Sequence, residues 1–234
     1  MSRARNPSRV AIVEDHLLFA EALEVALSLQ GHDVHRVPVT DGSLSSGQLL
    51  AGLLRLRPRV VLLDLDLGPA GSGTRLVEPL TQSAVAVVVL TGSTDRARWG
   101  ECIRNGARTV LPKTAPLNTI LATIRLIGEG RPVLSREERD SLLTSFHEEK
   151  RTLQELRWRL ETLTNREREI LGHLMEGRAV REIARRSYVS EATVRTQVKS
   201  ILAKLDVTSQ LAAVGAAHAS RWRPPSQQGQ PGAG

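Results

Sequence analysis

The sequence predicts two folded units: an α/β domain on a doubly wound, five-stranded parallel sheet, and an all-α domain that a helical segment joins to it. Short β-branched runs alternate with longer amphipathic stretches over the first half of the chain, as in βαβ units around a parallel sheet. A charged stretch with leucines at heptad positions follows, and short amphipathic helices come after it. The length of 234 residues suits two domains of ordinary size.

Five apolar runs are the expected strands of the α/β domain. They are VAIV (10–13), HDVHRV (32–37), RVVLLD (59–64), AVAVVVLT (84–91) and RTVLP (108–112). Strands buried on both faces of a parallel sheet read as continuous apolar runs, so the less apolar second run is expected at an edge. An open sheet of this kind binds its ligands at the carboxyl ends of its strands. We therefore expect the chemistry at that edge.

The composition excludes several classes of protein. The longest apolar runs, such as residues 84–90, have the length of a strand and fall far short of the ~20 residues of a membrane span. The first residues carry arginines with no apolar segment behind them, so no secretory signal is expected. One cysteine, Cys102, allows no internal disulfide. We expect a cytoplasmic protein without membrane contact.

Residues 132–162 are expected to form a helical linker. Apolar side chains fall on the a and d positions of one heptad register, with Glu149 as the single break. These positions are Leu142, Phe146, Leu153, Leu156, Leu160 and Leu163. The pattern predicts either a coiled coil between protomers or one amphipathic helix packed on its own domain, and both alternatives stay open. Residues 1–8 and 220–234 are expected to be disordered, because the tail is too rich in Pro, Gly and Gln to support a core.

Polar side chains follow four of the expected strands. Glu14 and Asp15 come after the first, Asp64 ends the third, Thr91 ends the fourth, and Lys113 follows the fifth. Crowded carboxylates repel one another and need a cation, and hard oxygen ligands favour Mg²⁺. Each residue alone has a structural explanation, such as a solvated turn, a helix cap or a surface lysine. Their order at successive strand ends is what indicates a site for phosphoryl chemistry.

Four segments carry a resemblance to a known family. VAIVEDH, PRVVLLDLDLG, VVVLTGS and GARTVLPK resemble the signatures of response-regulator receiver domains over residues 9–131, which implies a flavodoxin-like fold. The resemblance implies that Asp64 is the phosphoacceptor, with Thr91 as the switch residue and Lys113 as the phosphate-pairing cation. It also implies a Mg²⁺ site at Asp64, with Asp15 as a direct ligand, Glu14 as a ligand through water, and the backbone carbonyl of Asp66 completing the protein ligands.

Two features depart from the receiver pattern. Val110 stands where the family usually has a switch aromatic, and the loop DLDLGPAGSG after Asp64 is about one residue longer than usual. Gly92 keeps the small size that the family has after the threonine. The phosphorylation chemistry is therefore expected to be intact, whereas its conformational readout is expected to differ.

Residues 163–219 are expected to contain a helix-turn-helix. Thr164 and Glu167 form a capping box before the first helix, the short helix REIARRS follows, and Ser190 caps a longer helix. On that longer helix the apolar residues share one face, namely Val194, Val198, Ile201 and Leu205. The opposite face then carries Arg195, Thr196 and Lys199, and we expect no acid on it. Periodicity alone leaves a small helical bundle with a solvated basic face as an equal alternative.

Resemblance favours the DNA-binding alternative. LTNREREIL, REIARRS, VSEATVRTQVKSILAKLDV and the helix that follows resemble the LuxR-type DNA-binding domain. The resemblance implies that Arg195, Thr196 and Lys199 contact base edges or phosphates. It also implies that Glu191 and Thr193 begin the helix near a phosphate. Gln197 and Gln210 depart from the family pattern, so no role is transferred to them.

Together these features predict a two-component response regulator rather than an enzyme. A sensor histidine kinase would phosphorylate Asp64, which would control homodimerisation and sequence-specific binding to double-stranded promoter DNA, with RNA polymerase as a further partner. One alternative is a phosphohydrolase of the haloacid-dehalogenase type, but that family places its nucleophile on the first strand and an acidic pair after the lysine. Another is a transcription factor that works without phosphorylation, which Val110 keeps open.

Overall fold

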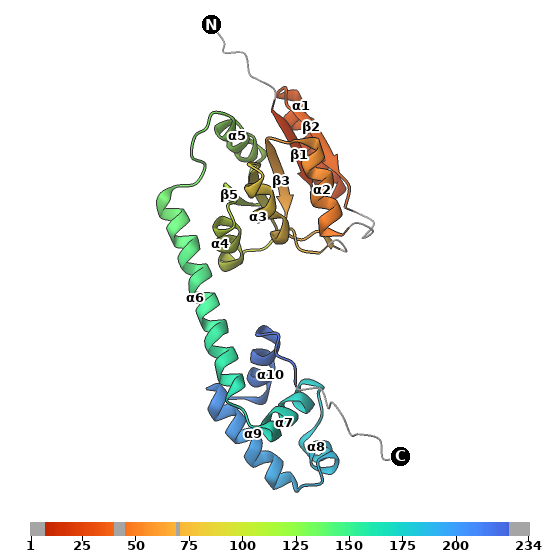
Figure 1. The fold of residues 1–234 in the computed structure, drawn as a ribbon, viewed down its shortest axis with the longest axis vertical. Helices are drawn as coiled ribbons and strands as arrows, with labels where there is room; N and C mark the ends of the chain where they lie inside the picture. Colours follow the sequence, from red (N-terminus) through yellow and green to blue (C-terminus); the bar gives the residue numbers. More distant parts are fainter. Residues whose placement is uncertain (1–7, 40–44, 69–70, 225–234) are drawn as a thin grey trace. The chain divides into compact units, whose positions relative to one another are not determined.

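The computed structural model describes residues 8–39, 45–68 and 71–224. Contacts within the chain divide it into two compact units, with the division between His147 and Glu148. Figure 1 shows both units. None of the helices in the described part of the chain combines the length and the apolar character needed to cross a bilayer.

The N-terminal unit is a five-stranded parallel sheet with the strand order β2-β1-β3-β4-β5. Its strands are β1 (Arg9–Val13), β2 (Asp33–Val37), β3 (Val60–Asp64), β4 (Ala86–Thr91) and β5 (Thr109–Pro112). Its helices are α1 (Leu17–Leu29), α2 (Ser46–Leu56), α3 (Thr74–Gln82), α4 (Arg96–Arg104) and α5 (Leu117–Gly128). The five expected strands and the edge position of the second are confirmed.

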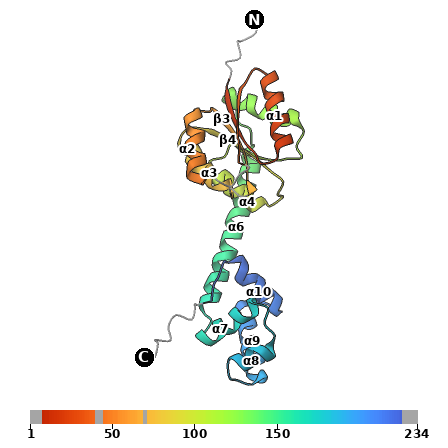
Figure 2. The ribbon, with the colours of Figure 1, turned by 90° about the vertical axis from the view of Figure 1, so that its right-hand side faces the viewer.

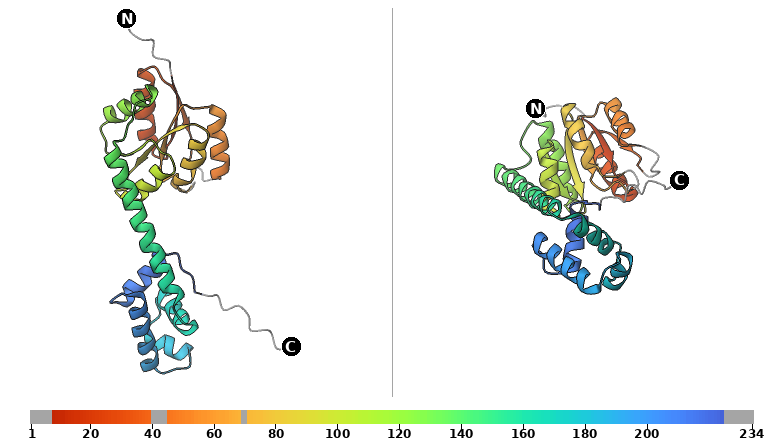
Figure 3. Two further views of the ribbon diagram at one scale, coloured as in Figure 1. Left: turned by 60° about the vertical axis from the view of Figure 1, so that its left-hand side comes forward. Right: turned by 60° about the horizontal axis from the view of Figure 1, so that its bottom comes forward.

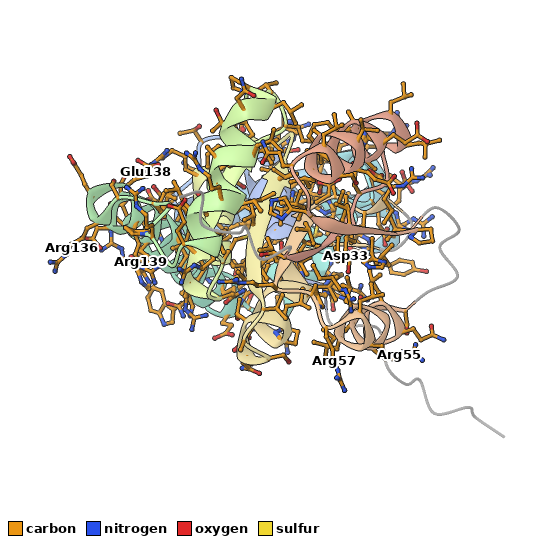
Figure 4. All side chains as sticks on the ribbon, turned by 90° about the horizontal axis from the view of Figure 1, so that it is seen from above. Asp33, Arg55, Arg57, Arg136, Glu138 and Arg139 are labelled. Atoms are coloured by element: carbon orange, nitrogen blue, oxygen red, sulfur yellow. The ribbon has the colours of Figure 1, made fainter. Side chains whose placement is uncertain are left out.

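Helices cover both faces of this sheet, as Figures 2 and 3 show. Alternate residues of each strand point to opposite faces, and two apolar cores result. In β1, Val10 and Ile12 join the core under α1 and α5, whereas Ala11 and Val13 join the core under α2, α3 and α4. The central strand β3 is buried at all of its residues, while β2 is only partly buried. Charged side chains at the end of α2 face solvent: Figure 4 shows Arg55 and Arg57 pointing outward there.

The helix α6 (Arg136–Glu161) covers most of the expected linker. Its apolar positions pack within the unit to which each belongs. Leu142 is buried in the core under α4, and Leu160 and Leu163 are buried in the core of the C-terminal unit. Leu153 is half-buried and belongs to neither core. The heptad pattern is thus used largely for packing within one chain.

The C-terminal unit is all-helical. Its helices are α7 (Asn165–Met175), α8 (Val180–Arg186), α9 (Glu191–Leu205) and α10 (Gln210–Ala219). α9 packs against α7, α8 and α10 through the apolar face that the sequence predicts (Figure 2). The expected caps are present: Thr164 and Glu167 form the reciprocal capping box, and the Ser190 hydroxyl accepts the Thr193 N–H at 3.1 Å.

The expected disorder of the termini needs correction where the structure describes them. The Ser8 carbonyl accepts the Asp33 N–H at 3.2 Å, and Ser8 is 7% exposed. Ser220 is also buried, Trp222 packs against the C-terminal core, and Pro224 lies against Gly172. An aromatic side chain supplies apolar area that the composition of the whole tail conceals. Residues 1–7 and 225–234 lie outside the described residues.

Candidate functional site

The carboxyl edge of the sheet brings together the residues that the sequence places at strand ends. β1 leads directly into Glu14 and Asp15, Asp64 is the last residue of β3, and Thr91 is the last residue of β4. Lys113 follows β5, and its N–H donates to the Thr91 carbonyl at 2.8 Å. Parallel strands in register end at one edge, so the fold alone makes these side chains neighbours.

The Lys113 ammonium group is the centre of the site. Its Nζ donates to Asp64 Oδ2 and to Glu14 Oε1, both at 2.7 Å. Burial raises the pKa of Asp64, and the hydrogen bond from Lys113 offsets this only in part. Burial alone would lower the pKa of Lys113, but its hydrogen bonds to the two carboxylates outweigh that effect and leave its pKa raised. A permanent positive charge therefore stabilises two carboxylates that burial would otherwise penalise.

The acidic residues form a cluster suited to a cation. Ligand atoms of Glu14, Asp15, His16 and Asp64 all lie within 4.8 Å of one another. Glu14 Oε2 is buried and, within the described part of the chain, accepts no hydrogen bond. A buried carboxylate oxygen without a donor is costly and is a natural ligand for a hard cation. Sequence reasoning missed His16, although it directly follows the acidic pair; its Nδ1 lies 3.0 Å from Glu14 Oε1.

The loop after β3 is held close to Asp64. The Asp66 N–H donates to Asp64 Oδ1 at 3.1 Å, while the Asp66 carboxylate points away from the cluster and binds Arg98 at 2.7 Å. Arg98 also donates to the Leu65 carbonyl at 3.1 Å. Gly73 passes so close that a Cβ there would overlap the Asp64 carbonyl oxygen. Only glycine fits, and its absent side chain lets the loop fold back over the end of β3.

Thr91 is fully buried, and its hydroxyl oxygen accepts the Ser93 N–H at 3.0 Å. Added atoms at Gly92 would meet open space, so the chain leaves room beside the threonine. Val110 is 6% exposed and packs in the apolar core under α2, α3 and α4. The aliphatic side chain of Val110 has no polar group that could form a hydrogen bond to Thr91.

The C-terminal unit presents a second candidate site on α9. Arg195, Thr196 and Lys199 are exposed, as the sequence predicts, and so are Glu191 and Thr193. The expectation that this face carries no acid was wrong: Glu191 Oε2 pairs with Arg195 at 3.1 Å. Residues four apart lie on the same side of a helix, so the first residue of the helix contributes to this face.

Comparison with known proteins supports this two-unit reading. Residues 10–125 match the response regulator receiver domain, and residues 161–217 match the bacterial regulatory proteins of the luxR family. The two matches coincide with the sheet domain and with the helices that carry the exposed α9 face.

Two relatives match nearly the whole chain. The transcriptional regulatory protein LiaR of Bacillus subtilis is 31% identical over 90% of this chain and 96% of its own. The DNA-binding transcriptional activator DevR/DosR of Mycobacterium tuberculosis is 30% identical over 93% of this chain and 97% of its own. Among solved structures, RcsB from Salmonella enterica serovar Typhimurium bound to promoter P1flhDC with a phosphomimetic shares the fold, with a TM-score of 0.50 and 21% identity over 90% of this chain and 98% of the other. The chain belongs to the response-regulator family in which a receiver domain is joined to a LuxR-type DNA-binding domain.

Proposed function

We propose that a sensor histidine kinase phosphorylates Asp64 and that this modification controls dimerisation and the binding of α9 to promoter DNA. The observation that carries the proposal is the hydrogen-bonded arrangement of Asp64 with Lys113 at 2.7 Å, next to an acidic cluster. In the reaction, an Asp64 carboxylate oxygen forms a bond to phosphorus while the bond from phosphorus to the donor breaks. Lys113 is placed to hold the added negative charge, and Thr91 to donate its hydroxyl to a phosphoryl oxygen.

The acidic residues offer the oxygen ligands that a hard cation such as Mg²⁺ prefers. Glu14 and Asp15 would hold the ion together with Asp64 and the carbonyl of Asp66, and its charge would offset that of the incoming phosphoryl group. Glu14 keeps a buried oxygen free of hydrogen bonds, and Arg98 holds the side chain of Asp66 so that its backbone stays beside Asp64. These residues thus supply oxygen ligands without a rearrangement of the sheet.

The proposal for DNA rests on charge and on relatives. Residues 178–204 contain seven basic side chains against two acidic ones, Glu182 and Glu191. Phosphate neutralisation by such side chains supplies most of the affinity for duplex DNA. Two relatives are named as transcriptional regulators. α9 would enter the major groove with Arg195, Thr196 and Lys199 towards the bases and phosphates, while RNA polymerase would act as a further partner.

Acetyl phosphate tests the site without requiring the cognate kinase. The parent chain should gain the mass of one phosphoryl group in the presence of Mg²⁺, and Asp64→Asn should gain none, because Asp64 supplies the attacking oxygen. Asp33→Asn is the matched control. Asp33 is the first residue of β2, so it lies at the amino ends of the strands, whereas the site lies at their carboxyl ends (Figure 4). Intact-mass spectrometry measures all three.

A phosphoryl mass on Asp64→Asn, or an unchanged gain after chelation of Mg²⁺, would show that the site is assigned wrongly. Sustained turnover of acetyl phosphate with no stable adduct would instead favour a phosphohydrolase. A stable adduct that changes neither the oligomeric state nor DNA affinity would favour a transcription factor that works without phosphorylation, the alternative that Val110 keeps open.

A further inference from the structure

The loop between β4 and α4 contains a chain of hydrogen bonds that begins at Thr91. The Ser93 N–H donates to the Thr91 hydroxyl oxygen at 3.0 Å. The Ser93 carbonyl in turn accepts the indole N–H of Trp99 at 3.0 Å. A single residue therefore connects the Thr91 hydroxyl to an aromatic side chain on α4.

The same loop is continuous with the start of α4. The Asp95 N–H donates to the Ser93 hydroxyl at 3.2 Å, and Asp95 Oδ1 caps the helix by accepting the N–H groups of Ala97 and Arg98 at 3.0 and 3.1 Å. Arg98 itself holds the loop after β3 through Leu65 and Asp66. A shift at either loop is thus transmitted to the first turn of α4.

Within the N-terminal unit, α4 packs closely against the first part of α6. Arg96 donates to Glu138 at 3.2 Å and to the Ser141 hydroxyl at 3.1 Å; Figure 4 shows Glu138 near the beginning of α6. A Cβ at Gly100 would overlap the Leu142 carbonyl oxygen, so the two helix backbones touch there. Close-packed elements do not deform continuously, and movement of α4 must displace α6.

We propose that Trp99 is the positioning residue that transmits the state of Thr91 to α4 and to the first part of α6. Val110, buried on β5, offers no polar group for this task, whereas Trp99 is already hydrogen-bonded into the threonine loop. The inference rests on the proposed function, because Thr91 has a state to report only when Asp64 becomes phosphorylated.

The mechanism follows from the direction of each hydrogen bond. A Thr91 hydroxyl that turns towards a phosphoryl oxygen takes its oxygen away from the Ser93 N–H, and Ser93 must shift to find another acceptor. The indole N–H of Trp99 can only donate, so it either follows the Ser93 carbonyl or loses its partner. If this hydrogen bond is made in one state only, its removal changes the equilibrium between the two states about fivefold.

Hydrogen exchange of the full chain, with and without acetyl phosphate and Mg²⁺, tests the proposal. Trp99→Phe keeps an aromatic ring but removes the N–H, and Trp158→Phe is the matched control because Trp158 is 66% exposed on the later part of α6. Both variants should gain the same phosphoryl mass as the parent. The parent and Trp158→Phe should show a phosphorylation-dependent change of amide protection in α4 and residues 136–147. That change should be smaller in Trp99→Phe, by the amount that an equilibrium constant lowered about fivefold gives.

A spectroscopic readout keeps the test independent of any loss of stability in Trp99→Phe. The sequence has three tryptophans, so the double variant Trp158→Phe, Trp222→Phe leaves Trp99 as the sole indole, and its emission should shift on phosphorylation. An unchanged emission, or a full protection change in Trp99→Phe, overturns the role of Trp99 alone. A parent chain that gains no phosphoryl mass overturns the proposed function as well, and the mass measurement separates the two failures.

Discussion

Glu167 shows how one residue can combine a helix cap with the core of a domain. It is 3% exposed, and its carboxylate accepts from Lys204 at 2.6 Å and from the Ser200 hydroxyl at 2.7 Å. It also accepts the Thr164 N–H at 2.7 Å as part of the capping box. Burial would raise the pKa of Glu167, but these hydrogen bonds, that of Lys204 foremost, outweigh it and lower the pKa to about 2.

The depressed pKa predicts a pH-dependent contribution to stability. The pKa of Glu167 has its ordinary value of 4.5 in the unfolded chain and is about 2 in the folded chain. The contribution to stability is therefore complete above about pH 5 and is lost as the pH falls to 2. Glu167→Gln should therefore lower the free energy of unfolding by at most about 3 kcal/mol at pH 7, and the difference should shrink at acidic pH. Urea unfolding of the full chain at several pH values, followed through Trp222 in a Trp99→Phe, Trp158→Phe background, measures it.

Glu169→Gln is the control for this prediction. Glu169 is about half exposed and pairs with Arg166 on the helix surface at 2.8 Å, and exposed pairs of this kind contribute less than about 1 kcal/mol. An equal loss of stability for Glu167→Gln at pH 3 and at pH 7 would contradict the role assigned to its charge.

At the scale of residues, the sequence was sufficient to predict the site residues that lie at the ends of strands. Asp64 and Thr91 each close an apolar run, and parallel strands in register place such ends together. The links between Arg98 and Asp66 and between Trp99 and Ser93 were not predictable. They depend on how a helix lies against two loops, and no periodicity in the sequence records that contact. His16 was missed because one more polar residue after an acidic pair carries no signal of its own.

At the scale of elements, α6 shows what a heptad pattern leaves undecided. A coiled-coil seam and a helix that packs into two successive cores both require apolar residues at the same spacing. Burial of Leu142, Leu160 and Leu163 within their own units accounts for half of the six positions. Leu156 packs against the C-terminal core and Phe146 lies next to Gly100 on α4. Leu153 is half-buried and belongs to neither core, so it is the position left for a partner chain.

Leu153 is therefore the position at which pairing of α6 between protomers is tested. If two copies meet there, Leu153→Gln should convert a phosphorylated dimer to a monomer, because it places an amide in an apolar seam. Light scattering of the acetyl phosphate-treated chain measures the mass. Glu155→Gln, a change at an exposed neighbour on the same helix, should leave the mass as it is.

Leu160 is unsuitable for this experiment, because it is fully buried in the C-terminal core and a polar residue there would destabilise that unit. An unchanged mass for Leu153→Gln would show that any dimer forms elsewhere and that α6 serves only packing within one chain.

At the scale of the whole molecule, two units with separate cores each carry one candidate site: the acidic cluster in the receiver domain and the exposed face of α9 in the LuxR-type domain. The division was predictable because the apolar pattern changes period along the chain, from strands with intervening helices to helices alone. The limits of the units were less so: residues 220–224 join the C-terminal unit through Trp222, and the first part of α6 packs on the sheet domain. Both depend on a few side-chain contacts that average composition hides.

The exposed face of α9 gives a prediction for the complete protein on DNA. Arg195→Ala and Lys199→Ala each remove a positive charge, so binding should weaken on all sequences and the slope of log affinity against log salt should fall by about one unit if the contact is to phosphate. If the contact is to a guanine edge, roughly 1–3 kcal/mol of discrimination should be lost at one base pair. Arg195→Ala should have the larger effect, because it leaves the Glu191 carboxylate without its partner beside the DNA.

Titrations of the full chain on genomic fragments at several salt concentrations measure both quantities. Arg136→Ala is a control with the same change of charge, because the Arg136 side chain is 94% exposed at the start of α6 (Figure 4), and it should bind like the parent. Two half-sites about one helical turn apart are expected if two protomers each place α9 in the major groove. If neither α9 variant differs from the parent on any fragment at any salt concentration, then α9 does not enter DNA. The C-terminal unit would in that case be a helical bundle whose basic face is merely solvated.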